Sequence, residues 1–400
     1  MNDVELAPEI TIVGGGIGGL TTALFLHRAG FKVQVFEQAA ELLEVGAGIM
    51  LAPNALRLLD QLGLAAEIRE VGVQLEAGWE FRRWQDGRIL SSQPLGGVCE
   101  EKYGVPMLTV HRAHLLDILY RALPPNVLHL GAQAINMDQD EQGAWVVFGD
   151  GREVRSGCVI AADGMHSRLR SLVARENQPR FSHLCAWRAL VQREKAPDFT
   201  HAPVQALWLG PGRHVVHYPV ASGRMINVIA TTPAATGELA SWTAEGNPDE
   251  LVDEFENWDP SLVQLLSSIE KVGRWAIFDR DPIDNWVVGR LGLLGDAAHP
   301  MLATFAQGAA QAIEDAAALA VCLANSRADL KAGLQHYQQV RVQRANQLVM
   351  MSRGRPEHHH LPDGADQIAR DAALATQKPL ANMDWIYSYD AEHEARATLL

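Results

Sequence analysis

The stretch ITIVGGGIGG, residues 10–19, decides the fold. Three of its first four residues are apolar, the fourth being Thr11, and they run directly into glycines; residues 20–28 then show the apolar spacing of a helix. Strand, glycine turn and helix in this order are the context in which G-x-G-x-x-G binds a dinucleotide. Gly14 permits the tight turn, Gly16 lets the backbone approach a pyrophosphate, and Gly19 lets the helix pack on the strand. We therefore expect phosphates at the N-terminus of this helix.

A second strand and an acidic residue follow the helix. Gly30 is a helix stop, residues 32–37 alternate as a strand does, and Glu37 comes eighteen residues after Gly19. A carboxylate at this strand end accepts hydrogen bonds from ribose hydroxyls and repels a 2′-phosphate. The glycines alone are a weak signal. Together with the strand, the helix and Glu37, they specifically predict a dinucleotide site. They do not distinguish FAD from NAD.

The bulk composition is that of a soluble two-domain protein. A chain of 400 residues exceeds the size at which one hydrophobic core keeps growing. A net charge of -14 argues against nucleic acid or an anionic membrane as the main partner. The longest apolar runs fall short of the roughly 20 residues that a membrane helix needs. Four scattered cysteines without C-x-x-C spacing favour a reducing compartment, so we expect a cytoplasmic protein.

The chain divides into regions of different texture. Residues 1–180 and 286–350 hold the dinucleotide unit, further buried strands and long helices, and we assign them to the cofactor-binding domain. Residues 181–285 consist of short alternating segments between Gly and Pro turns, which predicts an antiparallel substrate domain joined by segments near 72–108. Residues 351–400 form a C-terminal helical extension. The predicted class is α/β, with a Rossmann-like domain interleaved with a smaller antiparallel-sheet domain and C-terminal helices.

Two further motifs could touch a cofactor. GDAAHP at 295–300 follows a buried strand and precedes an Ala-rich helix over 307–324. Asp296 there can bond ribityl hydroxyls, and a helix N-terminus aimed at a flavin stabilises negative charge on the ring. Alternatively, Asp296 only caps a turn. Asp163 with Gly164 is a third candidate, and it too could be a mere turn.

Three segments in this order resemble the single-component FAD-dependent aromatic hydroxylases related to p-hydroxybenzoate hydroxylase. They are GGGIGG at 14–19, AADGMHSRLR at 161–170 and GDAAHP at 295–300. Within that group, GPGRHVVHYP at 210–219 and FAQGAAQAIEDA at 305–316 look most like salicylate hydroxylases, 3-hydroxybenzoate 6-hydroxylases and 6-hydroxynicotinate 3-monooxygenases. The similarity spans nearly the whole chain.

This resemblance implies FAD as the cofactor and assigns residues to it. Glu37 holds the adenosine ribose, and Arg112 meets the ribityl and pyrophosphate portion. Asp163 and Gly164 serve both FAD and the reduced nicotinamide. Asp296 bonds ribityl or pyrophosphate groups, and Pro300, Gly308 and Ala309 border the isoalloxazine.

The resemblance also implies the reaction. NADH or NADPH reduces FAD, O2 adds, and the resulting flavin C4a-hydroperoxide hydroxylates a small aromatic compound ortho or para to a hydroxyl or amino group. The compound is a phenolic acid or a hydroxylated N-heterocycle, and the protein is a monomer or homodimer. Two alternatives stay open. One is an FAD-dependent reductase or dehydrogenase of geranylgeranyl-reductase type, and the other is a non-catalytic FAD-binding redox protein.

The substrate side is predicted from one strand. His214 and Tyr218 are four residues apart, so on a strand their side chains share a face, and His217 points to the opposite face. The resemblance puts His214 where relatives have a base for the substrate hydroxyl, and neutral imidazole suits that role. Otherwise His214 is an ordinary strand histidine. Tyr218 orients substrate or only packs, and Tyr103 is a weaker candidate by the same match.

Two positions depart from the relatives. Ala303 stands where relatives often place a polar or aromatic side chain over the substrate. Met50 stands where the hydroxynicotinate enzymes have a motif that contains a histidine. Both change the expected pocket wall. We therefore do not transfer a relative's substrate to this chain.

Three consecutive histidines at 358–360 raise the question of a metal. Adjacent residues on a regular element cannot all converge on one ion. We expect no metal site and interpret the whole segment 353–364 as a surface loop.

Overall fold

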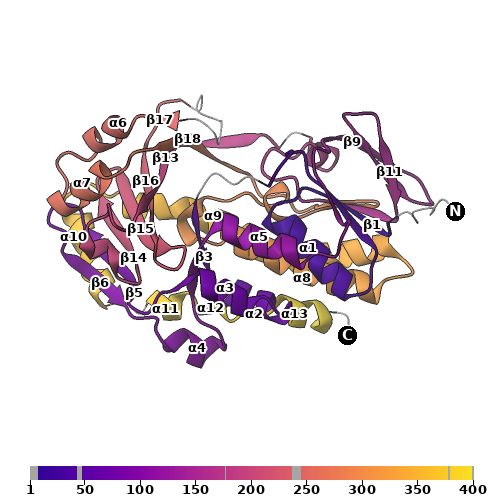
Figure 1. Cartoon of the computed structure of the whole chain (residues 1–400), viewed down its shortest axis with the longest axis horizontal. Helices are drawn as coiled ribbons and strands as arrows, with labels where there is room; N and C mark the ends of the chain where they lie inside the picture. Colours follow the sequence, from indigo (N-terminus) through magenta and orange to yellow (C-terminus); the bar gives the residue numbers. More distant parts are fainter. Residues whose placement is uncertain (1–7, 43–46, 176, 237–244, 377–378, 399–400) are drawn as a thin grey trace.

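The computed structural model describes residues 8–42, 47–175, 177–236, 245–376 and 379–398. Figure 1 shows an elongated molecule with β1 and α8 towards the N-terminal end and a second layered region around β14–β16 at the other end. Helix α9 lies between the two regions in this view.

A six-stranded sheet forms the first region. Its strands in spatial order are β19 (Val287–Val288), β20 (Leu291–Leu293), β12 (Cys158–Ala161), β1 (Ile10–Val13), β2 (Val33–Phe36) and β8 (Leu128–His129). All neighbours are parallel except the β19–β20 pair. Strands β1 and β12 are buried along their whole length, as continuous apolar runs in a parallel sheet should be. The predicted α/β class is confirmed.

Helices pack closely against this sheet. Helix α1 (Ile17–Arg28) lies against α8 (Gly308–Asn325) and also contacts α5 (Arg112–Ala122), and the three helices lie close together in Figure 1. A methyl group on Gly18 would sit 3.2 Å from Cβ of Ala312. Small residues therefore let α1 and α8 approach, which explains the Ala-rich composition of α8.

The second region is an eight-stranded sheet. Its order is β17 (Glu245–Gly246), β18 (Val272–Arg280), β13 (Pro179–Gln192), β16 (Met225–Pro233), β15 (Arg213–Val220), β14 (Val204–Gly210), β5 (Gly78–Arg83) and β6 (Ile89–Gln93). Every pair is antiparallel except β14–β5. Helices α6 (Pro248–Asp253) and α7 (Pro260–Ser267) pack their apolar side chains against one face. The face that carries His214 is turned to α9.

Two smaller sheets complete the strands. The first contains β3 (Gly48–Leu51), β7 (Leu108–His111) and β4 (Val73–Gln74), with α2 (Pro53–Gln61), α3 (Ala65–Val71) and α4 (Val98–Tyr103) beside it in the chain. The second contains β9 (Ala134–Gln139), β10 (Ala144–Phe148) and β11 (Glu153–Ser156), near the N-terminus in Figure 1. Short 3-10 turns include η3 (Gly295–Ala297) and η4 (Ala303–Phe305).

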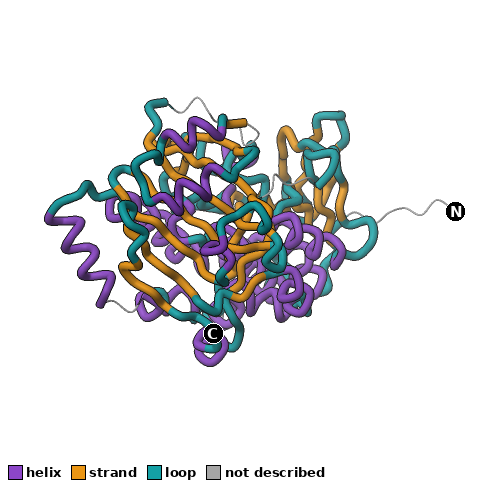
Figure 2. Tube along the Cα trace, turned by 60° about the vertical axis from the view of Figure 1, so that its left-hand side comes forward, coloured by secondary structure: helices purple, strands orange, loops and turns teal. Residues whose placement is uncertain are grey.

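The C-terminal part is helical. After α9 (Leu330–His359) come α10 (Ala365–Thr376), α11 (Pro379–Asn382), α12 (Asp384–Tyr387) and α13 (Ala391–Ala397). Helix α10 lies beside β6 at the outer edge of the large sheet, at the left of Figure 2, and α13 returns to α8. None of the helices within the described ranges is long and apolar enough to cross a membrane.

The expected surface loop over 353–364 is wrong for its first half. Helix α9 continues through Pro356 to His359, and the His359 side chain is buried. A residue of another helix stabilises the last turn of α9: Arg370 of α10 donates a hydrogen bond of 3.0 Å to the carbonyl oxygen of His359. Sequence composition alone missed this tertiary support for the last helical turn.

Candidate functional site

The glycine turn has the geometry that a pyrophosphate needs. Gly14 has φ of +108°, and a Cβ on it would lie 2.2 Å from the carbonyl oxygen of Ala162. A Cβ on Gly19 would lie 1.9 Å from the carbonyl oxygen of Gly14. Gly16, by contrast, faces open space at the start of α1, so an anion can approach the amides there. This cradle fits the diphosphate of a dinucleotide.

Glu37 is held in place at the end of β2. Its Oε2 accepts a hydrogen bond from the backbone N–H of Gly15 at 2.6 Å, and its Oε1 accepts one from Ala39 at 2.8 Å. Each carboxylate oxygen can accept a second bond, which suits a ribose diol. The carboxylate thus lies directly beside the glycine turn.

Asp163 lies against the same turn. A Cβ on Gly14 would be 3.0 Å from Cα of Asp163, so the two motifs touch. The Oδ2 atom accepts from the backbone N–H of Arg168 at 3.1 Å, while Oδ1 is buried without a hydrogen-bond partner among the described residues. Burial raises the pKa of the Asp163 carboxyl. A buried carboxylate oxygen needs a donor, and a cofactor hydroxyl is one. Gly164, with φ of +78°, has open space around it.

The third motif lies at the start of α8. The Asp296 side chain is exposed, and desolvation by the surrounding protein raises the pKa of its carboxyl. The charges of His299 and Arg112 oppose this rise. A Cβ on Gly308 would lie 4.0 Å from Oδ1 of Asp296. Pro300 is buried and Ala309 half-buried at the same end of α8. Asp296 and Gly308 thus lie close together at the N-terminal end of α8, where the charge of Arg112 also acts on Asp296.

Arg112 connects this cofactor side with the large sheet. Its backbone N–H donates to the carbonyl oxygen of Ala47 at 2.9 Å. The next residue, Gly48, donates its own N–H to Oδ1 of Asn227 on β16 at 2.7 Å. A Cβ on Gly48 would lie 2.6 Å from the ring of Tyr218 on β15. Tyr218 therefore stands next to the segment that carries Arg112.

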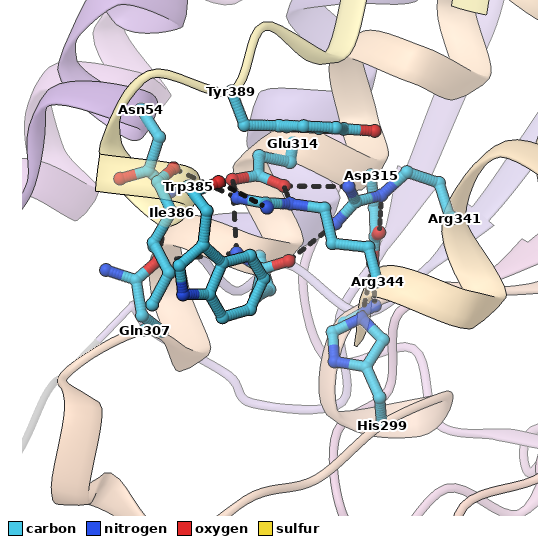
Figure 3. Close-up of polar contacts among 12 residues, drawn as sticks. Asn54, His299, Gln307, Glu314, Asp315, Arg341, Arg344, Trp385, Ile386 and Tyr389 are labelled. Carbon is cyan, nitrogen blue, oxygen red and sulfur yellow. Dashed lines mark hydrogen bonds and ion pairs between the residues drawn. The ribbon is translucent and has the colours of Figure 1, made fainter. Parts of the chain in front are cut away.

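A buried ionic network fixes the loop before α8 (Figure 3). Asp315 accepts hydrogen bonds from the N–H of Gly295 at 3.0 Å, from Nε2 of His299 at 2.6 Å and from Nε of Arg341 at 2.8 Å. Burial opposes ionisation, but the charges of His299 and Arg341 outweigh it and lower the pKa of Asp315 to about 2. The motif that carries Asp296 is thus anchored at both of its ends.

Glu314 extends the network to the C-terminal helices. Its carboxylate accepts from Nη1 of Arg341 at 2.7 Å and from Nε of Arg344 at 2.8 Å. Arg344 also donates to the carbonyl oxygens of Trp385 and Ile386 at 3.1 and 3.0 Å. Sequence reasoning missed this network. Its signal was an adjacent Glu and Asp inside an apolar helix, with two arginines three residues apart on the next helix.

His214 and Tyr218 share a face of β15, as predicted. Tyr218 pairs across the strands with Asn227, and His214 pairs with Thr231. Four residues of strand separate their Cα atoms by about 13 Å, so the two side chains lie on one face and do not touch. His217 is on the opposite face, against Phe199.

His214 has partners that sequence reasoning did not identify. Its Nδ1 lies 2.7 Å from Nε2 of His360, and its ring packs edge-on against His359 with centroids 5.8 Å apart. Burial, followed by the charge of His360, lowers the pKa of His214 to about 3. The imidazole is therefore neutral near pH 7.

In the described part of the chain, no group of three or more His, Cys, Asp or Glu side chains is placed to hold a metal ion.

Tyr103 belongs to an apolar wall. Its hydroxyl donates to Oδ1 of Asp384 at 3.0 Å, and its ring lies edge-on to Tyr387 with centroids 6.0 Å apart. Met50 is buried in the same cluster, whereas Ala303 is exposed at η4. The Tyr103 hydroxyl is thus engaged by the C-terminal segment.

Comparison with known proteins gives a consistent set of relatives. A model of the FAD binding domain family matches residues 8–352. The chain is 38% identical to 3-amino-4-hydroxybenzoate 2-monooxygenase PtmB3 of Streptomyces platensis, over 96% of each chain. It is 33% identical to 3-hydroxybenzoate 6-hydroxylase 1 of Aquipseudomonas alcaligenes, over 94% of this chain and 96% of that one. The structure of Klebsiella pneumoniae HpxO with FAD and uric acid superposes with a TM-score of 0.83 at 27% identity, covering 94% of this chain and 95% of that one.

These similarities confirm the resemblance drawn from the motifs. They extend over nearly the entire length of the chain and of each relative. The glycine turn, the strand ends and the large sheet all lie within the region shared with these relatives.

Proposed function

The chain belongs to the FAD binding domain family, and on that premise we propose that it hydroxylates a small phenolic acid or hydroxylated N-heterocycle with NADH or NADPH and O2. Relatives at 38% and 33% identity over nearly the full length are aromatic monooxygenases, which makes this chain a flavoprotein aromatic hydroxylase. The amino- and hydroxybenzoates in their names direct us to substrates that carry a ring hydroxyl or amino group beside a carboxylate.

The fit of the protein to FAD supports this function. Bound FAD supplies, with a reduced nicotinamide and O2, the electrophilic oxygen for the reaction. The glycine turn would hold its diphosphate, and Glu37 its ribose. Asp163 would accept a bond from a cofactor hydroxyl, because its Oδ1 has no partner within the described ranges. Asp296 and Gly308 would lie along the remainder of the cofactor, at the positive end of the α8 dipole.

The placement of His214 carries the proposal for the substrate. It is a neutral imidazole on the sheet face shared with Tyr218, and Tyr218 adjoins Gly48 next to the Arg112 segment. A neutral imidazole can accept a hydrogen bond from a ring hydroxyl, or its proton when a partner stabilises the imidazolium, and so increase the electron density of the ring. His214 is the base in this proposal, and Tyr218 orients the ring.

Arg188 supports the choice of an acid. It pairs across the strands with Ile229, which in turn pairs with Val216, so it shares the face of His214 and Tyr218. Its guanidinium lies over Trp275, 5.2 Å from the ring centroid. A cation on this face favours a substrate carboxylate.

A substrate panel tests this function. The FAD-loaded protein is mixed with NADH or NADPH and with hydroxylated aromatic acids or N-heterocycles in turn. We expect at least one compound to stimulate nicotinamide oxidation, with matching O2 uptake and a product heavier by one oxygen atom. A substrate reduced without O2 uptake would favour a reductase, and no stimulation by any compound would favour a non-catalytic redox protein.

A further inference from the structure

The C-terminal end of α9 is attached to the strand that carries His214. The backbone N–H of Gly212, just before β15, donates to the carbonyl oxygen of His360 at 3.0 Å. The rings of His214 and His360 are tilted by 34° with centroids 5.0 Å apart, and Nδ1 of His214 is 2.7 Å from Nε2 of His360. A backbone bond to Gly212 and a side-chain bond to His214 thus both hold His360 against the start of β15.

The hydrogen bond between the two imidazoles contains one proton. The residue that donates it decides whether Nε2 of His214 can accept a proton from the substrate. If His360 Nε2 donates, the proton of neutral His214 stays on Nε2, and this nitrogen cannot accept another. If His214 Nδ1 donates, Nε2 keeps its lone pair. Only the second arrangement makes His214 a base towards the substrate.

We propose that His360 is a positioning residue: its Nε2 accepts a hydrogen bond from Nδ1–H of His214, which leaves Nε2 of His214 as the atom that takes the substrate proton. The proposal rests on the proposed function, because it assigns His214 to the substrate hydroxyl. In the step, the substrate O–H bond breaks and an Nε2–H bond forms. The phenolate keeps the electron pair, His214 becomes an imidazolium, and no electron is transferred between molecules.

The surroundings of the pair keep His360 neutral. His360 is partly exposed, and its burial, followed by the charge of Arg213, lowers its pKa to about 4. Arg213 is itself paired with Glu254 at 2.6 Å. From α9, the buried His359 faces His214, and the charges of Arg355 and His358 act on His359. Burial and the charge of Arg213 thus disfavour a second proton on His360, so His360 is neutral near pH 7, and with its one proton on Nδ1 it presents the Nε2 lone pair to His214.

The same contact stabilises the product of the step. An imidazolium at His214 is buried, and a buried cation is costly without an acceptor for its N–H groups. The Nε2 lone pair of His360 supplies one acceptor, as the orienting partner does in a catalytic triad. Loss of this partner should weaken the base without removing it from the site.

The test replaces His360 by Leu and by Gln, with His358→Leu as the matched control on the same turn. His358 is exposed, so its replacement removes a neighbouring histidine and leaves the pair intact. Gln keeps an acceptor oxygen near the place of Nε2, and Leu does not. Two readouts are used: 15N NMR of histidine-labelled protein without substrate, and the absorbance spectrum plus kcat and KM with the best compound of the panel.

We expect wild-type His214 to carry its proton on Nδ1, and His360→Leu to lose this preference. We also expect His360→Leu to lower kcat and bound phenolate by about 10- to 100-fold, as loss of an orienting partner of a histidine does, with KM within about twofold. His360→Gln should recover most of this loss, and His358→Leu should equal the wild type.

A wild-type His214 protonated on Nε2, or a His360→Leu variant that ionises substrate like His358→Leu, would overturn the proposal. Failure of the proposed function has a different signature. In that case the wild-type protein itself would ionise and hydroxylate none of the compounds, while the NMR measurement would still report the tautomer.

Discussion

The backbone N–H of Gly48 donates a 2.7 Å hydrogen bond to Oδ1 of Asn227, and this bond joins β3 to the large sheet. It places the cofactor-side segment in contact with the face of β15 that carries Tyr218. The position of β3 relative to this face of β15 therefore depends on a residue that has no functional side chain.

Replacing Gly48 by Ala should disturb the substrate side selectively. The added methyl would lie 2.6 Å from Cε2 of Tyr218 and 2.8 Å from Cγ of Asn227, so one of these groups must move. We expect a loss of about 1–3 kcal/mol of stability from overpacking and a higher KM for the aromatic substrate. Steady-state kinetics and urea unfolding measure both.

Gly354→Ala is the control for that variant. Gly354 lies in α9, and a Cβ on it meets open space. Alanine there should raise stability by about 0.5–1 kcal/mol, because it is the better helix former, and should leave KM unchanged. Equal KM values for both variants would show that close packing at Gly48 does not position Tyr218.

Replacing Glu37 by Gln should weaken FAD binding. The carboxylate is held by Gly15 and Ala39, and its charged oxygens are stronger acceptors for ribose hydroxyls than an amide oxygen. We expect Kd for FAD to rise about tenfold, which corresponds to about 1.4 kcal/mol. Fluorescence titration of the apoprotein with FAD is the measurement. The exposed Glu41→Gln should match the wild type, and an unchanged Kd for Glu37→Gln would remove Glu37 from the ribose site.

Replacing Glu314 by Gln should be strongly destabilising. The variant leaves Arg341 and Arg344 buried without the carboxylate that both contact. Breaking a buried pair in this way typically costs about 3–5 kcal/mol of unfolding free energy. The exposed pair Lys195–Glu270 is the contrast, since Glu270→Gln should cost under about 1 kcal/mol. Chemical denaturation compares them, and equal losses would mean that the buried network contributes no more than a surface pair.

His217 should make the protein less stable in mild acid. Burial, followed by the charge of Arg82, lowers its pKa to about 3, and both ring nitrogens are buried without hydrogen-bond partners in the described structure. In the unfolded chain, His217 binds a proton below about pH 6.5, whereas in the folded protein it binds one only below about pH 3. The free energy of unfolding therefore falls as pH decreases through this window.

His217→Leu removes this penalty. Between pH 7 and pH 5 the variant should gain about 2 kcal/mol relative to the wild type, because 1.5 pH units below the unfolded pKa correspond to about that energy. Urea unfolding at the two pH values gives the difference. His393→Leu, at an exposed position, is the control. Parallel pH dependences for wild type and His217→Leu would show that His217 takes up its proton in the folded state.

The parts of the site that are local in sequence were predictable. Gly14, Gly16, Gly19 and Glu37 lie on one strand-turn-helix-strand unit, so their spacing alone places them together. The shared face of His214 and Tyr218 follows from the two-residue period of a strand in the same way. Composition also identified the region that forms most of the large sheet.

The parts that depend on tertiary contact were not predictable. The histidines at 358–360 read as a polar loop, but burial of His359 and the bond from His214 to His360 come from two segments about 146 residues apart. The partners of Glu314 likewise lie on another helix. Periodicity describes one element at a time, so it does not report which charged residues pair inside the core.

The most direct test of the account is the origin of the oxygen in the product. The FAD-loaded protein, a reduced nicotinamide and the stimulating hydroxylated aromatic acid are incubated under 18O2, and the product is weighed by mass spectrometry. A flavoprotein aromatic hydroxylase predicts one 18O atom per product molecule, with one nicotinamide oxidised and one O2 consumed. A product without 18O, or a reduced product formed without O2, would contradict it.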